Sequence, residues 1–192
     1  MRKIVCFLTE GDNTPDFTVS NAAGALADMQ GYVRTRYVVA QKGQEANWNT
    51  TYPAFYNAVN FGEAGATAKY KAPVNTSGWF LPSGGQFVQI YNNLNGDGTD
   101  LTSSNIANRN ALTSIVEAIN GKFTLVGGTE LVGTNSVIYW TSVEKSATHA
   151  YLFDISINQS AEKEYDAKFK IDAPNGVKKS SNTRAIRPIL AF

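Results

Sequence analysis

The stretch Gly78-Trp79-Phe80-Leu81-Pro82-Ser83-Gly84-Gly85-Gln86 says more about the fold than any other part of this sequence. Its last four residues form a Ser-x-x-Gln capping box, in which Ser83 and Gln86 each satisfy a backbone amide at the start of a helix. Apolar residues then recur with the spacing i, i+3, i+4 and i+7, at Phe87, Ile90, Tyr91 and Leu94. The pattern predicts an amphipathic helix that begins after Ser83 and ends at Gly96.

The other elements follow from their own signals. A second helix is predicted from Thr51, with Pro53 in its first turn, to Gly62, and a third from Ser103 or Ser104 to Gly121. Alternating or short apolar runs predict strands at residues 3–9, 32–41, 122–126, 137–143, 149–157, 165–171 and 183–192. Residues 21–30 are predicted as a loop and 174–176 as a turn. Strands at both ends with helices between them indicate an α+β domain, and we expect one domain over residues 1–192.

Composition excludes several classes of function. The net charge of the 192-residue chain is +1, so no electrostatic field would attract nucleic acid. Cys6 is the only cysteine, which rules out an internal disulfide or a cysteine zinc site. The apolar runs are too short to span a membrane, and we expect neither a signal peptide nor an anchor within the chain. Abundant Asn, Ser, Thr, Gly and Tyr with few Lys and Glu are typical of extracellular domains with long ordered loops.

Three blocks of this sequence resemble a C-type-lectin-like domain of secreted and surface proteins of gut Bacteroidetes, related to fimbria-associated and retroelement-diversified modules. The blocks are Gly78 to Ser83, then Tyr139-Trp140-Thr141-Ser142, then Arg184-Ala185-Ile186-Arg187-Pro188-Ile189-Leu190. The resemblance covers residues 32–192. It implies a small twisted antiparallel sheet in which the first and last strands pair, with flanking helices and a ligand surface on loops and late strands. The Glu-Pro-Asn, Gln-Pro-Asp and Trp-Asn-Asp triplets of calcium-dependent lectins are missing, so calcium-mediated sugar binding is not implied.

Candidate metal and catalytic groups are few. Asn93-x-Asn95-x-Asp97-Gly98 matches the first half of a calcium loop, but the twelfth position, which needs a glutamate, is Ser104. The same residues fit a polar turn, so calcium near Asn93 to Asp97 stays open, and we expect no metal and no cofactor. His149 is the only histidine and no Gly-x-Ser-x-Gly motif accompanies it. We therefore expect no catalytic residue.

The sequence therefore favours a non-enzymatic binding or adhesion module, extracellular or at a cell surface, that recognises a glycan or a protein partner. Two alternatives remain: a structural subunit of a fimbria or other surface assembly, and a glycan-active hydrolase with an unrecognised site. We expect a monomer. Trp79 and Trp140 are predicted to pack in the core. The predicted ligand-contact residues, chosen from strand alternation and expected exposure, are Tyr139, Thr141, Glu144, Lys145, His149, Tyr151, Asn182 and Trp48.

Overall fold

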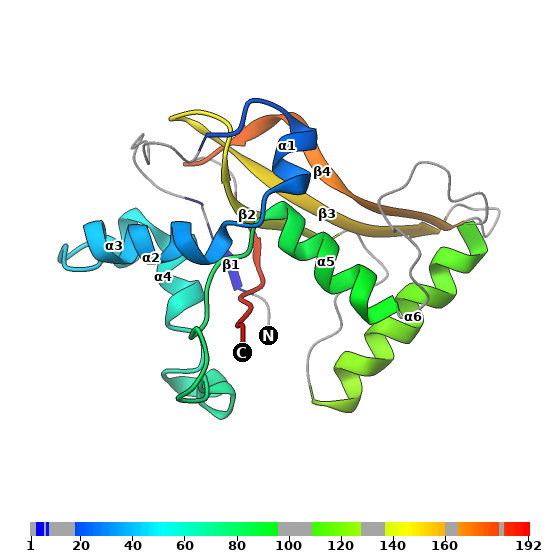
Figure 1. Cartoon of the computed structure of the whole chain (residues 1–192), viewed down its shortest axis with the longest axis horizontal. Helices are drawn as coiled ribbons and strands as arrows, with labels where there is room; N and C mark the ends of the chain where they lie inside the picture. The colour runs from blue at the N-terminus through cyan, green and yellow to red at the C-terminus, as the bar shows by residue number, and fades with distance from the viewer. Residues whose placement is uncertain are drawn as a thin grey trace.

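The computed structural model describes residues 3–5, 7, 18–95, 109–127, 137–159, 165–180 and 183–192. The fold is α+β (Figure 1). Its strands are β1 (Lys3–Val5), β2 (Val137–Glu144), β3 (His149–Gln159), β4 (Tyr165–Lys178) and β5 (Arg184–Ile186). Its helices are α1 (Ala22–Ala27), α2 (Gly31–Lys42), α3 (Trp48–Thr51), α4 (Pro53–Val59), α5 (Gly84–Asn95) and α6 (Arg109–Leu125), with a 3-10 helix, η1 (Gly65–Tyr70).

The five strands form one open sheet in the order β1-β5-β2-β3-β4. β1 pairs antiparallel with β5, as the resemblance implied (Figure 1). β2 pairs parallel with β5 through Tyr139 and Ala185, so the sheet is mixed and the expected all-antiparallel sheet is wrong. The β3–β4 hairpin extends beyond β2, because β2 pairs with β3 only between Ala150 and Ile155.

Helices cover both faces of the sheet. On one face, Phe87 and Tyr91 of α5 and Ile119 of α6 pack against Tyr139 and Phe153. On the other face, residues of α2 and α4 pack against the sheet; this cluster contains Val38, Phe55, Trp140, Leu152 and Ile186, among others. Figure 1 shows the two groups of helices on opposite sides, with α2, α3 and α4 to the left and α5 and α6 to the right. A central strand such as β2 is therefore buried on both faces.

The strand predicted at residues 32–41 is wrong, because these residues belong to α2. The buried face of α2 is formed by Gly31, Arg34, Thr35 and Val38, which follow the helical spacing i, i+3, i+4 and i+7. Only one of these four has an aliphatic side chain larger than a methyl group. The large apolar residues Tyr32, Val33 and Tyr37 are exposed. Apolar periodicity therefore gave no helical signal.

Other predicted boundaries also change. The predicted loop at residues 21–30 contains α1, which Asn21 caps by accepting a hydrogen bond from the Gly24 amide at 2.8 Å. The helix predicted from Thr51 to Gly62 corresponds to α4, which begins at Pro53 and ends at Val59. The short helix α3 precedes it and ends at Thr51, and Gly62 has a φ of +89° just beyond α4. The strand predicted at 122–126 is wrong, because α6 continues through Gly121 to Leu125. A methyl group on Gly121 would meet no atom within 4 Å, so this glycine sits at an open helical position instead of ending the helix.

Three late strands were predicted in the right places, but the strand predicted at residues 183–192 is much shorter, because β5 covers only Arg184–Ile186. β2 and β3 begin where expected, each ends slightly later, and β4 continues through the predicted turn at 174–176 to Lys178. The pairing register shifts between Ala150 and Leu152, and Gly176 has a φ of +75° on the facing strand. A β-bulge at this point lets the strand bend without ending. Ser103, Ser104 and Gly96, the predicted boundaries of two helices, lie outside the described residues.

Candidate functional site

The three blocks that carried the family resemblance meet in space. The Phe80 amide donates to the Ile189 carbonyl at 2.9 Å and the Ile189 amide donates back at 3.1 Å. The Ser142 amide in β2 donates to the Pro82 carbonyl at 2.8 Å. Leu81, Trp140 and Ile186 share one apolar cluster. Segments about sixty and about one hundred residues apart thus form one packed unit, and their role is architectural.

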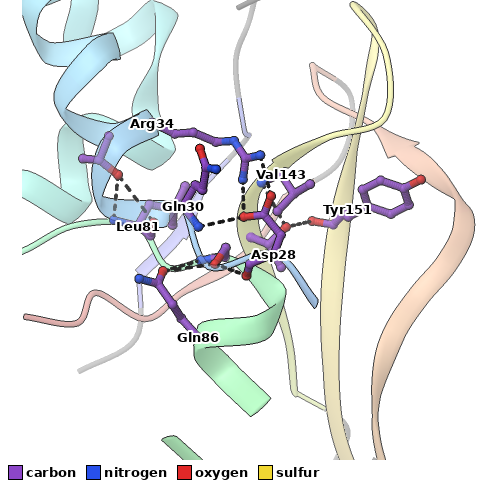
Figure 2. Close-up of polar contacts among 10 residues, drawn as sticks. Asp28, Gln30, Arg34, Leu81, Gln86, Val143 and Tyr151 are labelled. Carbon is purple, nitrogen blue, oxygen red and sulfur yellow. Dashed lines mark hydrogen bonds and ion pairs between the residues drawn. The ribbon is translucent and has the colours of Figure 1, made fainter. Parts of the chain in front are cut away.

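A buried polar cluster fixes the start of α5 against the turn between α1 and α2 (Figure 2). The Arg34 guanidinium donates to both carboxylate oxygens of Asp28, at 2.5 and 2.6 Å. The Gln86 side-chain oxygen accepts from the Ser83 amide at 3.0 Å, which confirms one half of the predicted capping box. The Ser83 hydroxyl differs from the prediction, because it donates to the Asp28 carbonyl at 2.5 Å. These hydrogen bonds connect Arg34 to Asp28, Asp28 to Ser83 and Ser83 to Gln86, so the cluster stabilises the junction.

Four of the predicted contact residues are buried. Tyr139, Thr141, Glu144 and Tyr151 each have 1% exposure or less, so the expectation of exposed side chains is wrong for them. Strand alternation predicts an exposed face only when one side of a sheet meets water. Here helices cover both sides: Tyr139 lies in the cluster under α5, whereas the neighbouring Trp140 lies in the cluster under α2 and α4.

The polar groups of these buried residues bind within the protein. The Thr141 hydroxyl donates to the Tyr151 carbonyl at 2.9 Å and accepts from the Val143 amide at 3.2 Å (Figure 2). These bonds lie at the register shift between Trp140 and Glu144, where the ladder to β3 is interrupted. The Tyr151 hydroxyl donates to a backbone carbonyl at 3.0 Å, and burial raises the pKa of Tyr151.

Glu144 is held by an ion pair in the interior. Its carboxylate lies 3.0 Å from the Lys179 ammonium, and both side chains are nearly inaccessible to solvent. The ammonium also lies over the Phe7 ring, 5.6 Å from its centroid. The Glu144 carbonyl accepts a hydrogen bond from the Val19 amide at 2.8 Å. Glu144 therefore ties the end of β2 to the turn after β4 and to the segment before α1.

Three predicted contact residues are partly exposed. Lys145 donates from its ammonium to the Ser20 carbonyl, and the His149 ring lies 2.8 Å from the Thr148 hydroxyl through Nδ1. Trp48 is half-buried and packs edge-to-face on Tyr56, with ring centroids 4.9 Å apart. Lys145 and His149 flank the short turn between β2 and β3, whereas Trp48 lies in α3. Of these three residues, the structure therefore brings together only Lys145 and His149. Asn182 lies outside the described residues.

The predicted core tryptophans are placed as follows. Trp140 is fully buried. Trp79 is half-buried; its indole N–H donates to the Tyr70 carbonyl at 2.8 Å and its ring packs edge-to-face on Phe61. Trp79 thereby holds the 3-10 helix η1 against the end of α4.

A cavity of about 540 Å³ lies between α4, η1 and the chain after β5. This volume is within the range of small-molecule sites in proteins. The lining residues are Tyr56, Asn57, Asn60, Phe61, Glu63, Ala64, Ala66, Thr67, Ile186 and Pro188. The sequence reasoning missed this site, because it assigned Tyr56 to the buried face of a helix and residues 62–70 to no element. The signal in the sequence is the close spacing of two aromatic residues, two asparagines and one glutamate within residues 56–63.

The predicted calcium pattern lies partly outside the described residues. Asn93 and Asn95 lie in the last turn of α5, whereas Asp97 and Gly98 lie outside the described residues. Across the described parts of the chain, no three His, Cys, Asp or Glu side chains gather in a way that could hold a metal ion. None of the helices in those parts is both long and apolar enough to cross a membrane.

Comparison with known proteins gives one structural likeness. No family model and no curated protein matches the chain. A solved structure described as a fimbrial protein from Bacteroides ovatus is similar, with 19% sequence identity and a TM-score of 0.45 over 86% of this chain. The match spans 25% of that protein's chain. Similarity at this level is too low to assign a function, so the function has to be argued from the geometry of the chain itself.

Proposed function

We propose that this chain is a non-enzymatic module of a cell-surface assembly such as a fimbria, and that it works outside the cell or at its surface. The observation that carries the proposal is the position of β4. This strand of 14 residues is the last in the sheet, and β3 is its only neighbour among the described strands. The outer edge of such a strand presents backbone donors and acceptors that a strand from a neighbouring subunit can bind.

The sequence of β4 favours a selective partner. Its sequence has charged residues at alternate positions: Asp166, Lys168, Lys170 and Asp172. Pro174 lacks an amide donor. Charges and proline on an edge strand oppose indiscriminate pairing. A neighbouring strand with complementary charges would still pair, because opposite charges across an antiparallel ladder stabilise it.

Adjacent proline substitutions in β4 test this proposal. In an antiparallel ladder, the backbone amides of consecutive residues point to opposite edges of the strand. One of the variants Ala167→Pro and Lys168→Pro therefore removes a hydrogen bond to β3, and we call it the inward variant. The other, the outward variant, removes only an amide donor on the outer edge of β4. The inward variant should lose stability. The outward variant should keep the fold and lose concentration-dependent association in sedimentation equilibrium. In place of the monomer expected from the sequence, the proposal requires that the wild-type chain associates with itself. A wild-type chain that stays monomeric at millimolar concentration, or an outward variant that associates like wild type, would contradict the proposal.

The fold that we propose for residues 1–192 is a single C-type-lectin-like domain. Two observations support it: β1 pairs with β5, and the three sequence blocks pack together around Phe80, Pro82 and Trp140. An experimental structure in which the first and last strands do not pair would contradict this assignment.

A second candidate function, ligand binding, is favoured by the cavity beside α4. In the part of its lining that the structure describes, one residue carries a carboxylate, Glu63, whereas a glycan hydrolase needs two that converge. We therefore propose recognition without catalysis, of a glycan or protein ligand. Trp48, which contacts Tyr56 of the cavity wall, and the pair Lys145 and His149 stay proposed contact residues. Glycan-array binding of the chain with and without calcium tests this function, and failure to bind any glycan would shift the assignment to a protein ligand or to assembly alone.

A further inference from the structure

We propose that the cavity between α4, η1 and the chain after β5 binds a primary ammonium group on an apolar stem, such as a lysine side chain or an alkyl diamine. The inference rests on the cavity being a ligand site. Two observations support it. The hydrogen-bond donors of the lining are mostly engaged within the protein, and aromatic rings form part of the cavity wall.

The donors of the cavity lining are largely engaged within the protein. The Asn57 and Asn60 side-chain nitrogens donate to the Pro53 and Tyr56 carbonyls, at 2.7 and 2.9 Å. The Thr67 hydroxyl donates to the Ala64 carbonyl at 3.0 Å. Because the nitrogen of Asn60 turns back to its own helix, its side-chain oxygen remains as an acceptor.

The formal charge of the cavity lining is negative. Among the described residues that line it, Glu63 is the only charged one, and a carboxylate can only accept hydrogen bonds. No ion pair within the described parts of the chain involves Glu63. The nearest basic residue in sequence, Lys69, lies over the Tyr70 ring, 4.9 Å from its centroid, and does not line the cavity. Together with the acceptor of Asn60, this carboxylate favours a ligand that donates and carries positive charge.

Aromatic rings add a second attraction for a cation. The Phe61 ring stacks on Tyr70, with centroids 5.7 Å apart and planes 12° apart, and Trp79 holds it from the edge. Tyr56 is held edge-to-face by Trp48. Tyr56 and Phe61 both line the cavity, and the electron-rich face of an aromatic ring attracts ammonium groups. The apolar lining residues Ile186, Pro188, Ala64 and Ala66 would contact the stem of the ligand.

Binding of n-pentylamine, with 1-pentanol as its neutral isostere and pentanoate as its anionic one, tests the proposal. Amide chemical shifts in an isotope-labelled sample report where each probe binds. We expect n-pentylamine to shift the resonances of residues 56–67 and to bind about fivefold or more tightly than 1-pentanol, since an ion pair and a cation–π contact each add a few-fold. Pentanoate should not bind.

Glu63→Gln is the matching variant, and Glu45→Gln is its control. Both glutamates are exposed, but Glu45 pairs with Lys42 on the surface and does not line the cavity. Glu63→Gln should weaken pentylamine binding about threefold to fivefold, whereas Glu45→Gln should leave it unchanged. Equal effects of the two variants, or equal affinities for pentylamine and pentanol, would overturn the choice of an ammonium ligand.

Two further probes separate the sources of the ammonium group. Tighter binding of N-acetyl-lysine methylamide than of 1,5-diaminopentane would support a lysine side chain of a partner protein, and the reverse order a free diamine. If pentanol shifts residues 56–67 and the amines do not, the cavity is a ligand site and the proposed ligand class is wrong. If no probe shifts these resonances, the cavity is not a ligand site.

Discussion

Gly31, the first residue of α2, lies against the backbone of Leu81 and Ser83, which leads into α5. A Cβ atom added at Gly31 would lie 2.6 Å from the Ser83 amide nitrogen, 2.7 Å from the Leu81 carbonyl oxygen and 2.2 Å from the Gln86 side-chain oxygen. The Gln86 side chain can move away. The two backbone atoms cannot, because Ser83 and Leu81 are held by bonds to Asp28 and Thr35. Gly31→Ala should therefore separate α2 from the start of α5.

The magnitude follows from these contacts. Overpacking in a close-packed interior costs about 1–3 kcal/mol, and two immovable backbone contacts below 3 Å place Gly31→Ala near the upper end. Alanine recovers up to about 1 kcal/mol, because it lowers the entropy of the unfolded chain and favours the helix. The net loss should be about 2 kcal/mol, which for a chain of this size lowers Tm by about 4–8 °C.

Urea denaturation followed by circular dichroism measures this loss, with Gly121→Ala as the matched control. Gly121 also lies in a helix, but a methyl group there meets no atom within 4 Å. Gly121→Ala should therefore raise the free energy of unfolding by about 0.5–1 kcal/mol. If Gly31→Ala unfolds at the same urea concentration as wild type or a higher one, the close approach at this junction does not limit the fold and the reasoning fails.

Three further predictions concern buried polar groups. Asp28→Asn should cost about 3 kcal/mol in urea denaturation, because it leaves the buried Arg34 guanidinium without its carboxylate, and a loss below about 1 kcal/mol would contradict the assigned role. Lys179→Met should lower the free energy of unfolding by about 3–5 kcal/mol, because it leaves the buried Glu144 carboxylate without the Lys179 ammonium. The double variant Lys179→Met/Glu144→Leu should recover most of that loss in the same assay. If it recovers none, the loss does not come from breaking a buried ion pair. Burial raises the pKa of Tyr151 above the ordinary value of about 10, so the neutral phenol adds stability that is complete below pH 10 and is lost as the pH rises through the folded-state pKa. Thermal unfolding from pH 8 to 11 should show a smaller alkaline decrease for Tyr151→Phe than for wild type, and equal decreases would refute the assignment.

The elements that the sequence predicted well are those with signals local to the chain. The helix after Ser83 combines a capping box with apolar residues at helical spacing, and α5 begins at Gly84. The β2–β3 hairpin and β4 were found by their alternating segments. The helix α2 was missed because its buried face contains Gly31, Arg34 and Thr35. Gly31 allows a close approach of backbone, Arg34 forms an ion pair, and Thr35 forms a hydrogen bond to Leu81. None of these contacts produces an apolar pattern in the sequence.

The candidate site depended even more on long-range packing. Alternation along β2 and β3 predicted an exposed face, but exposure depends on whether helices cover that face, and here they cover both. The cavity is formed by α4, η1 and Pro188, and Pro188 lies more than one hundred residues after the other two in the sequence. The periodicity of residues within one helix or strand cannot predict contacts between such distant segments.

The sequence alone determined that Gly78 to Gln86 would start a helix, because a capping box and a 3.6-residue repeat act between neighbours in the chain. It also determined that the late part of the chain would form strands. Three features became visible only in the folded chain: Phe80 pairs with Ile189, the Ser83 hydroxyl donates to the Asp28 carbonyl, and Tyr139 and Tyr151 lie in the core. The physical reason is that burial and pairing depend on surfaces contributed by distant segments, which exist only after the chain has folded.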